Sequence, residues 1–443
     1  MTAVTELRST IASPSGRVSR QKGVLLPLLY ILTFVTLTIP KAGFKWAGIP
    51  ITPGTILFLF TIFVWFMQAL LGKCPAPAKY ALPIIGTSFY FFVRILWAMM
   101  GGYEGIDYIF SLAVAPFATL VCISALRTHN DIDTVLRIFS ISFWVICLYG
   151  LLQFILGVET TALPGVTVNY SDWQASPMFW YMDKNNVVGN WIKLISTYQN
   201  GNLFGVNLLL IFPFAFIRIG TKWKPLAVAL FTLVGFFSLS RSVWMGMVLM
   251  GLISFLCIHP KKIRIQVTIA IKTFAVFIVC LGSWILFILS PQLQERLLQS
   301  TGGSAFEASG RTPELMELVS SSTSSLLGTL LGPLGVMDYS GSGYEITLAA
   351  VYQCSGLVGV LVLVILTIRF LLLFLRARHL QVCSAALLSV SIYFITSLIE
   401  GAYWLPPTSV VMWLVIGVGL SGLQTIPPLD SDSLPHSSLK GLR

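Results

Sequence analysis

The chain has 443 residues, of which 56% are hydrophobic and only 10% are charged. Soluble globular proteins carry about 25% charged residues, so this composition excludes a soluble enzyme, a disordered protein and a coiled coil. It leaves a helical protein with several membrane-spanning segments. The net charge of +11 would also suit a nucleic-acid-binding protein, but a membrane protein gains the same excess from its cytoplasmic loops.

Apolar runs along the chain predict the spans, because a spanning helix needs about 20 mostly apolar residues. About twelve such runs occur, at 24–40, 51–71, 80–100, 108–126, 138–156, 203–219, 225–239, 243–258, 267–289, 355–375, 382–399 and 408–423. The seventh and eighth are divided at 238–242, since an arginine among hydroxyl residues belongs at the membrane interface. The predicted fold is therefore all-α and polytopic.

The basic residues fix the orientation of these spans. With the N-terminus inside, nineteen of the 28 lysine and arginine residues fall on the inner side and seven on the outer side, as the positive-inside rule requires. We therefore expect cytoplasmic tails at 1–23 and 424–443 around a membrane domain at 24–423, and no nucleic-acid partner. Two outer loops are long, 157–202 and 290–354. Loops of such length are usually functional or disordered.

Cysteine and histidine limit the chemistry of an outer site. The seven cysteines show no CxxC spacing and are interpreted as small hydrophobic residues. All four histidines, at 129, 259, 379 and 436, fall on the inner side. A general base on the outer side must then be Asp or Glu. No nucleotide-binding motif is present, which disfavours an enzyme that is driven by ATP or uses a nucleotide sugar. We expect neither a cofactor nor a metal ion.

Two arginines are candidates for binding a phosphate group. Arg241 follows Ser240 at an outer helix end, where its guanidinium can bind phosphate with two hydrogen bonds. It could equally be an arginine that extends from a span boundary to the interface. Arg311 precedes an expected surface helix that begins at Thr312 and Pro313. An exposed ion pair with a nearby glutamate is the alternative interpretation.

Polar residues at the outer mouth are candidates for binding sugar. Gln199, Asn200 and Asn202 lead into the sixth span, where they can bind sugar hydroxyls or simply form a turn and an N-cap. Glu345 stands among apolar residues, and desolvation could raise its pKa towards that of a working base; a solvated carboxylate is the alternative. The aromatic residues of loop 157–202 could stack on sugars or form an interfacial belt.

Arg94 is expected inside the third span, nearer its outer end. Ionisable residues within spans are rare and commonly functional. The alternative is that its side chain extends outward to the interface.

The order of these motifs resembles the bacterial O-antigen ligase and Wzy-type O-antigen polymerase superfamily. An Asn-rich turn precedes one span, a Ser-Arg pair follows the next, and a large outer loop carries Ser309-Gly310-Arg311. Glu345 then stands 11 positions before Gly356, where a Gly-Leu-Val-Gly sequence opens a span. The resemblance covers roughly residues 190–375, together with the twelve-span layout.

The resemblance implies a metal-independent glycosyltransferase of GT-C-like architecture in the bacterial cytoplasmic membrane, with its active site facing outward. The donor and acceptor would be undecaprenyl-pyrophosphate-linked oligosaccharides, and a chain-length regulator would be a possible partner besides the lipid. Arg241 and Arg311 would bind the pyrophosphate, and Glu345 would act as the base. The resemblance implies substrate binding by Gln199, Asn200, Asn202 and Arg296. Arg94 and Tyr344 are further substrate-binding candidates.

Glu345 stands where the ligase pattern commonly has a histidine. This difference favours a polymerase of repeat units over a ligase that transfers finished glycan to another acceptor. A transporter or flippase of lipid-linked sugars is a further alternative. Transporters commonly carry ionisable groups near the midplane and an internal repeat, and the sequence shows no acidic residue clearly at a span centre.

Overall fold

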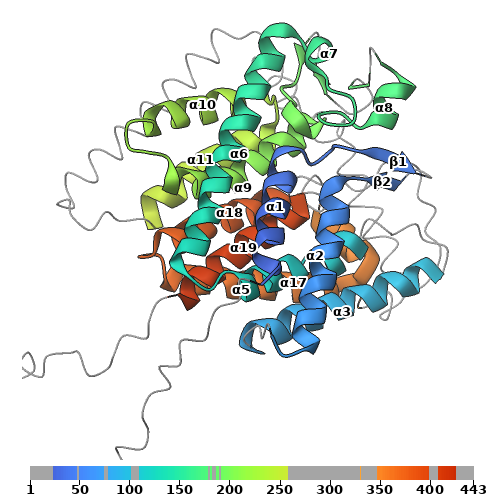
Figure 1. Ribbon diagram of the computed structural model, residues 1–443, viewed down its shortest axis with the longest axis vertical. Coiled ribbons are helices and arrows are strands. Elements are labelled where there is room, and N and C mark those ends of the chain that lie inside the picture. Colours follow the sequence, from blue (N-terminus) through green and yellow to red (C-terminus); the bar gives the residue numbers. More distant parts are fainter. Residues whose placement is uncertain are drawn as a thin grey trace, which may run out of the picture.

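The computed structural model describes residues 23–46, 49–73, 78–100, 109–177, 180–181, 186–188, 191–257, 330, 347–398 and 408–425. Helices dominate this part of the chain and pack into one bundle, and two short hairpins are its only sheets (Figure 1). The all-α class predicted from the sequence is confirmed for these residues.

Every predicted apolar run within the described residues coincides with a helix or with two consecutive helices. These are α1 (Leu25–Thr38), α2 (Pro53–Leu70), α3 (Ala78–Met100), the π-helix η1 (Ile109–Val114) with α5 (Phe117–Ala125), α6 (His129–Leu156), α9 (Gly201–Arg218), α10 (Lys224–Phe237), α11 (Arg241–Cys257), α17 (Thr347–Arg376), α18 (Gln381–Ser397) and α19 (Thr408–Gln424). The ninth run, 267–289, lies outside the described residues. Within the described residues, five stretches, in α2, α3, α6, α9 and α17, are long and apolar enough to cross a membrane, and six further apolar helices are shorter.

Helix α9 forms the centre of the bundle. Its residues from Leu203 to Ala215 are buried, and it packs against α6, α10, α11, α18 and α19. A helix that is apolar on every side lies either inside protein or across a membrane, and the neighbouring helices bury α9. The surrounding helices therefore fix both ends of α9, including its polar N-terminal turn.

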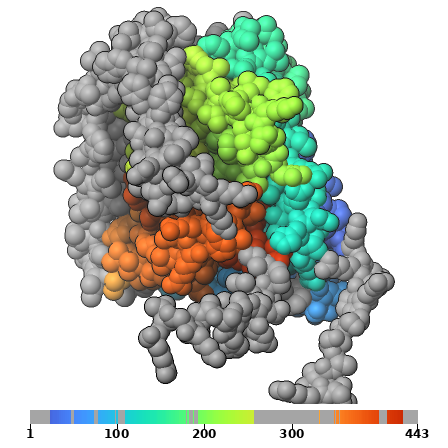
Figure 2. All heavy atoms as spheres, turned by 90° about the vertical axis from the view of Figure 1, so that its left-hand side faces the viewer, coloured from blue at the N-terminus to red at the C-terminus, as the bar shows by residue number. Residues whose placement is uncertain are grey.

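Other helices leave an apolar face uncovered. On α2 the exposed residues are Ile56, Leu59, Phe60, Phe63, Phe66, Met67 and Leu70, and on α17 they are Leu357, Leu361, Ile365, Ile368, Leu372 and Leu375. Figure 2 shows the orange side chains of the 347–398 segment at the surface on one side of the molecule. Water disfavours apolar patches of this extent on a soluble monomer, so these faces indicate a membrane protein.

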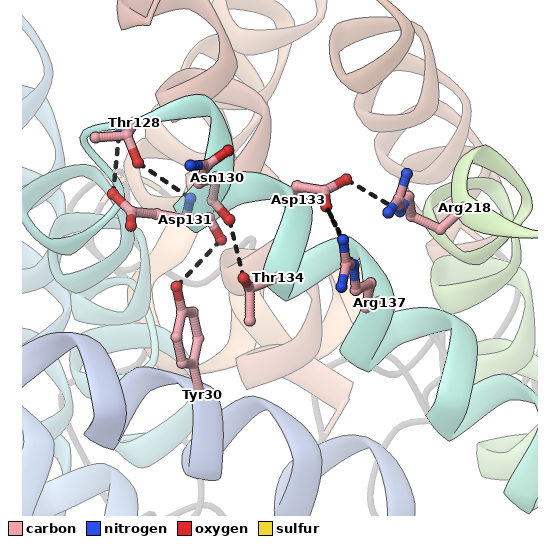
Figure 3. Close-up of polar contacts among 8 residues, drawn as sticks. All are labelled: Tyr30, Thr128, Asn130, Asp131, Asp133, Thr134, Arg137 and Arg218. Carbon is pink, nitrogen blue, oxygen red and sulfur yellow. Dashed lines mark hydrogen bonds and ion pairs between the residues drawn. The ribbon is translucent and has the colours of Figure 1, made fainter.

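Helix α6 begins earlier than the predicted span start at 138. Thr128 Oγ1 accepts a hydrogen bond from the N–H of Asp131 (3.2 Å), and the Asp131 carboxylate accepts one from the N–H of Thr128 (2.9 Å) (Figure 3). This reciprocal capping box starts the helix at His129. A search for apolar runs misses these turns because they are polar.

A group of charged residues joins α6 to its neighbours at the same end of the bundle. Asp133 pairs with Arg137 one turn along α6 (3.0 Å) and with Arg218 at the end of α9 (3.0 Å). Tyr30 on α1 donates a hydrogen bond to the carbonyl of Asp131 (3.4 Å), as Figure 3 shows. All five residues were assigned to the inner side or to the first span, and the structure brings them together.

The opposite end, called the outer end below, carries small elements that the sequence did not predict. Strands β1 (Phe44–Trp46) and β2 (Ile49–Ile51) form an antiparallel hairpin beside the short helix α8 (Tyr170–Ala175), and a second short helix, α7 (Val158–Thr161), follows the end of α6 (Figure 1). Lys45 Nζ lies 2.7 Å from Asp172 Oδ1 of α8. The predicted outer loop 157–202 is thus partly ordered by contacts with the first loop.

Helix α17 contains a sharp break. It begins at Thr347 rather than at 355, and Gly356 within it has φ 66° and ψ −169°. Only glycine adopts this combination readily. The Gly-Leu-Val-Gly sequence that was predicted to open a span therefore lies at a break between two helical segments.

Candidate functional site

Two polar turns meet at the outer end of the bundle. A Cβ atom on Gly201 would lie 2.9 Å from the Ser238 carbonyl oxygen and 2.7 Å from Lys193 Cβ, so the close approach requires glycine. The segments 199–202 and 238–241, which the sequence selected separately, are therefore neighbours.

Asn186 holds the first of these turns in place. Its side-chain N–H group donates to the carbonyls of Tyr181 (3.0 Å) and Gln199 (2.8 Å), and its Oδ1 accepts from the N–H of Gly201 (3.0 Å). Gln199 is buried with φ 60°, a left-handed conformation that is uncommon outside glycine. The sequence did not indicate a role for Asn186, because its residue type does not distinguish it from the other polar residues of the loop.

Asn200 is the N-cap of α9. Its Oδ1 accepts hydrogen bonds from the N–H groups of Asn202 (2.8 Å) and Leu203 (3.1 Å). These bonds satisfy helix N–H groups that have no partner within the helix. Of the two interpretations given for Asn200 above, the structure supports turn and cap formation.

Lys193 is a buried cation beside this helix start. Its side chain is only 3% exposed, and Nζ donates to Asn202 Oδ1 (3.2 Å). Sequence reasoning counted Lys193 among the outer basic residues but did not select it. The only sequence signal was the scarcity of outer lysines.

Arg241 begins α11, as the predicted break at 238–242 required. The turn before it contains Leu239 at φ 51°, and the hydroxyl oxygens of Ser240 and Ser242 lie 2.9 Å apart. A leucine in this left-handed conformation is strained, and such strain occurs frequently at functional sites. The turn therefore holds Arg241 at the start of a helix, where the helix dipole also favours an anion.

Arg94 lies beside the break in α17. One turn before it on α3, Tyr90 donates a hydrogen bond to the Ser355 carbonyl (2.8 Å), next to Gly356. Arg94 is 8% exposed and close enough to Cys354 to interact with it electrostatically. The burial of the Arg94 guanidinium beside a helix break argues against the alternative interpretation, in which the side chain extends outward to the interface.

The remaining predicted site residues lie outside the described residues. They are Glu345, Tyr344, Arg311 and Arg296, together with the surface helix expected to begin at Thr312. Their predicted roles stay predictions.

Aromatic residues of the first outer loop form a small core of their own. Trp180 and Tyr181 are 3% and 2% exposed and pack with Val158, Val168 and Ile195. Tyr181 also donates to Glu159 Oε1 (2.6 Å). Burial and this hydrogen bond raise the pKa of Tyr181 from 10.0 to about 12. These two rings stabilise the loop, so neither presents an open face to a sugar or to the interface.

Among the described residues, no group of three or more His, Cys, Asp or Glu side chains could hold a metal ion. Four of the cysteines, Cys122, Cys147, Cys354 and Cys383, are buried free thiols, as their sequence context predicted. No model of a known protein family matches the chain, and no curated protein is significantly similar to it in sequence.

Proposed function

We propose that this protein polymerises undecaprenyl-pyrophosphate-linked oligosaccharide repeat units for a bacterial surface polysaccharide. It would act on the outer side of the cytoplasmic membrane as a GT-C-like glycosyltransferase with about twelve spans. The proposal rests on the order of sequence motifs described above and on the cations at the outer helix ends.

The observation that carries the proposal is the burial of basic side chains where the outer loops meet the bundle. Lys193 is 3% exposed and Arg94 is 8% exposed, and Arg241 begins a helix beside the first of them. Positive groups in partly enclosed positions attract anions more strongly than groups in open solvent do. A pyrophosphate group carries negative charge that such cations can bind.

The reaction transfers the glycan from one lipid to the other. The acceptor hydroxyl oxygen attacks the anomeric carbon of the donor, the bond from that carbon to the pyrophosphate oxygen breaks, and lipid pyrophosphate leaves with the bonding electrons. Arg241 and Arg311 would stabilise the charge that grows on the leaving group. Glu345 would accept the proton of the acceptor hydroxyl.

The test is a reconstituted reaction. Purified protein in lipid vesicles, supplied with lipid-linked repeat unit as the only substrate, should produce a ladder of longer lipid-linked glycans on a gel. Movement of the lipid across the vesicle without a ladder would support a flippase. Transfer only to an added second acceptor would support a ligase.

Two substitutions test the proposed roles. Glu345→Gln removes the base and Arg311→Ala removes a pyrophosphate contact, so each should abolish the ladder while the amount of protein in the membrane stays unchanged. Normal ladders from both variants would contradict the mechanism.

A further inference from the structure

The hairpin of β1 and β2 has one apolar face. Side chains alternate between the two faces along a strand, and residues directly opposite each other in an antiparallel pair share a face. Phe44 and Trp46 therefore lie on one face of β1, and Ile51 joins them from β2 because the register pairs it with Phe44. Lys45, between the two aromatic residues, lies on the other face.

Helix α8 covers the face that carries Lys45. The Lys45 ammonium pairs with the carboxylate of Asp172 (2.7 Å), and the N–H of Lys45 donates to Ser171 Oγ (2.9 Å). A further bond, from the N–H of Gly43 to the Gly165 carbonyl (2.9 Å), ties the start of β1 to the same loop. These contacts fix the orientation of the hairpin, so its aromatic residues point away from α8.

The apolar face has little protein cover. Trp46 is 73% exposed, more than any other described tryptophan, and Phe44 is 49% exposed. Tryptophan side chains are mostly well buried in folded proteins, and burying such a ring removes a large apolar area from water. Two open aromatic rings side by side on a strand that is held rigidly on its other face indicate a surface that binds something apolar.

This surface adjoins the part of the molecule that a membrane would cover. Only Thr52 separates Ile51 from Pro53, the first residue of α2, and the exposed apolar residues of α2 begin at Ile56. Figure 1 shows the hairpin at the outer end of α2, extending to the side of the bundle. The hairpin therefore continues the apolar face of α2 at the level where hydrocarbon gives way to lipid headgroups.

We propose that Phe44 and Trp46 insert into the lipid headgroup layer at the outer end of the bundle and anchor the hairpin there. Tryptophan is enriched at this level of membranes, because its ring is apolar and its N–H is polar. A glycan or a soluble protein bound to the same face would have to displace the headgroups that surround the end of α2. The inference rests on the apolar face of α2 and not on the proposed polymerisation.

The test is site-specific photo-crosslinking of the full-length protein in the membranes of the expressing cells. The photoreactive amino acid p-benzoylphenylalanine replaces Phe44, Trp46 or Lys45, one position at a time, and mass spectrometry identifies the adducts. We expect phospholipid adducts at positions 44 and 46. Position 45 is the matched control on the opposite face of the same strand, and it should lose the lipid adduct and crosslink to the 170–175 segment instead.

The identity of the adducts decides between lipid and the other occupants. Adducts of positions 44 and 46 with glycan, with a second copy of the chain or with another protein, in place of phospholipid, would overturn the proposal. Lipid adducts of equal yield at position 45 would overturn it too, because the hairpin would then lack the orientation described. Only variants present in the membrane at the wild-type amount are compared.

A second measurement uses the native tryptophan. The fluorescence difference between the wild type and Trp46→Phe reports on Trp46, and it should be quenched in vesicles of phosphatidylcholine brominated near the headgroup end of its acyl chains. A difference that the brominated lipid leaves unchanged would overturn the anchor. Neither measurement requires polymer formation, so a failure of the proposed function would leave both outcomes interpretable.

Discussion

Lys193 carries its charge in a buried position at the start of α9, where it contacts Asn202. If this cation serves the pyrophosphate, Lys193→Met should reduce polymer formation at least about 10-fold, because one charge-assisted hydrogen bond contributes about 1.5–3 kcal/mol. Methionine keeps the apolar stem, so the fold should survive. The measurement is the initial rate of ladder formation at equal protein amounts.

Lys45→Met is the control for that substitution. Lys45 also lies at the outer end, but its exposed ammonium pairs with the partly buried carboxylate of Asp172 at 2.7 Å. Exposed pairs contribute about 0–1 kcal/mol, so this variant should polymerise normally. Equal rates for Lys193→Met, Lys45→Met and the wild type would show that Lys193 does not bind the pyrophosphate.

Tyr181 gives a pH dependence that belongs to the first outer loop. Its pKa is raised from 10.0 to about 12, so the neutral hydroxyl stabilises the folded state fully below about pH 10 and loses that effect as pH rises through about 12. Tyr181→Phe should lower the free energy of unfolding by about 1 kcal/mol at neutral pH. Thermal unfolding measured from neutral to alkaline pH should show the advantage of the wild type over Tyr181→Phe shrinking as the pH rises from about 10 towards about 12.

Tyr170→Phe is the comparison, since Tyr170 is 47% exposed and its hydroxyl bonds to no residue that the structure describes. It should unfold like the wild type. A difference between Tyr181→Phe and wild type that persists unchanged at high pH would contradict the role given to the Glu159 bond.

At the scale of elements, hydropathy located the helices but not their polar beginnings. The apolar run at 138–156 predicted a span start at 138, but the helix begins at His129 because Thr128 and Asp131 cap it there. The first loop became a hairpin because Gly43 and Lys45 bond to residues more than 100 positions away, in the 165–171 segment. Long-range hydrogen bonds leave no local pattern, so a single sequence cannot reveal them.

The same limit applies to the candidate site. Arg94, Arg241 and the 199–202 turn were selected from their residue types alone, and the structure gives each a defined place at the outer end. Lys193 and Asn186 were missed because their importance comes from burial and from partners in other turns. The residue types at a site can be identified from a sequence, whereas the burial of a side chain and its distant partners cannot.

The break in α17 can be tested at a single glycine. Gly356→Ala places a Cβ on a residue with φ 66° and ψ −169°, which strains the backbone by about 1–3 kcal/mol. We expect a lower thermal unfolding midpoint and reduced polymer formation, because the break lies beside Arg94. Gly251→Ala on α11 is the control, since its Cβ would meet nothing within 4 Å; it should be neutral or slightly stabilising.

A normal unfolding midpoint for Gly356→Ala would show that the break is not fixed by this backbone conformation. A lower midpoint for both glycine variants would indicate general sensitivity of the helices instead.

At the scale of the whole molecule, the predicted orientation and the observed packing agree on which residues share an end. The side chain of Arg127 donates to the Lys73 carbonyl (3.4 Å) and that of Arg369 to the Lys79 carbonyl (3.0 Å). All four residues were assigned inside from charge alone. Lys45 and Asp172, both assigned outside, meet at the other end.

This agreement leads to a labelling prediction for the intact cell. In a variant whose seven cysteines are replaced, single cysteines at Lys45 and Tyr170 should react with a membrane-impermeant maleimide added to intact cells. Cysteines at Lys73 and Lys222 should react only after the membrane is permeabilised, because Lys73 and Lys222 belong to the basic inner loops that the positive-inside rule retains in the cytoplasm. The chosen positions lie on exposed loops or helix ends, so substitution should not disturb the bundle. Labelling at position 73 in intact cells would show that the protein has the opposite orientation. The site would then face the cytoplasm, which contradicts the proposed polymerisation on the outer side.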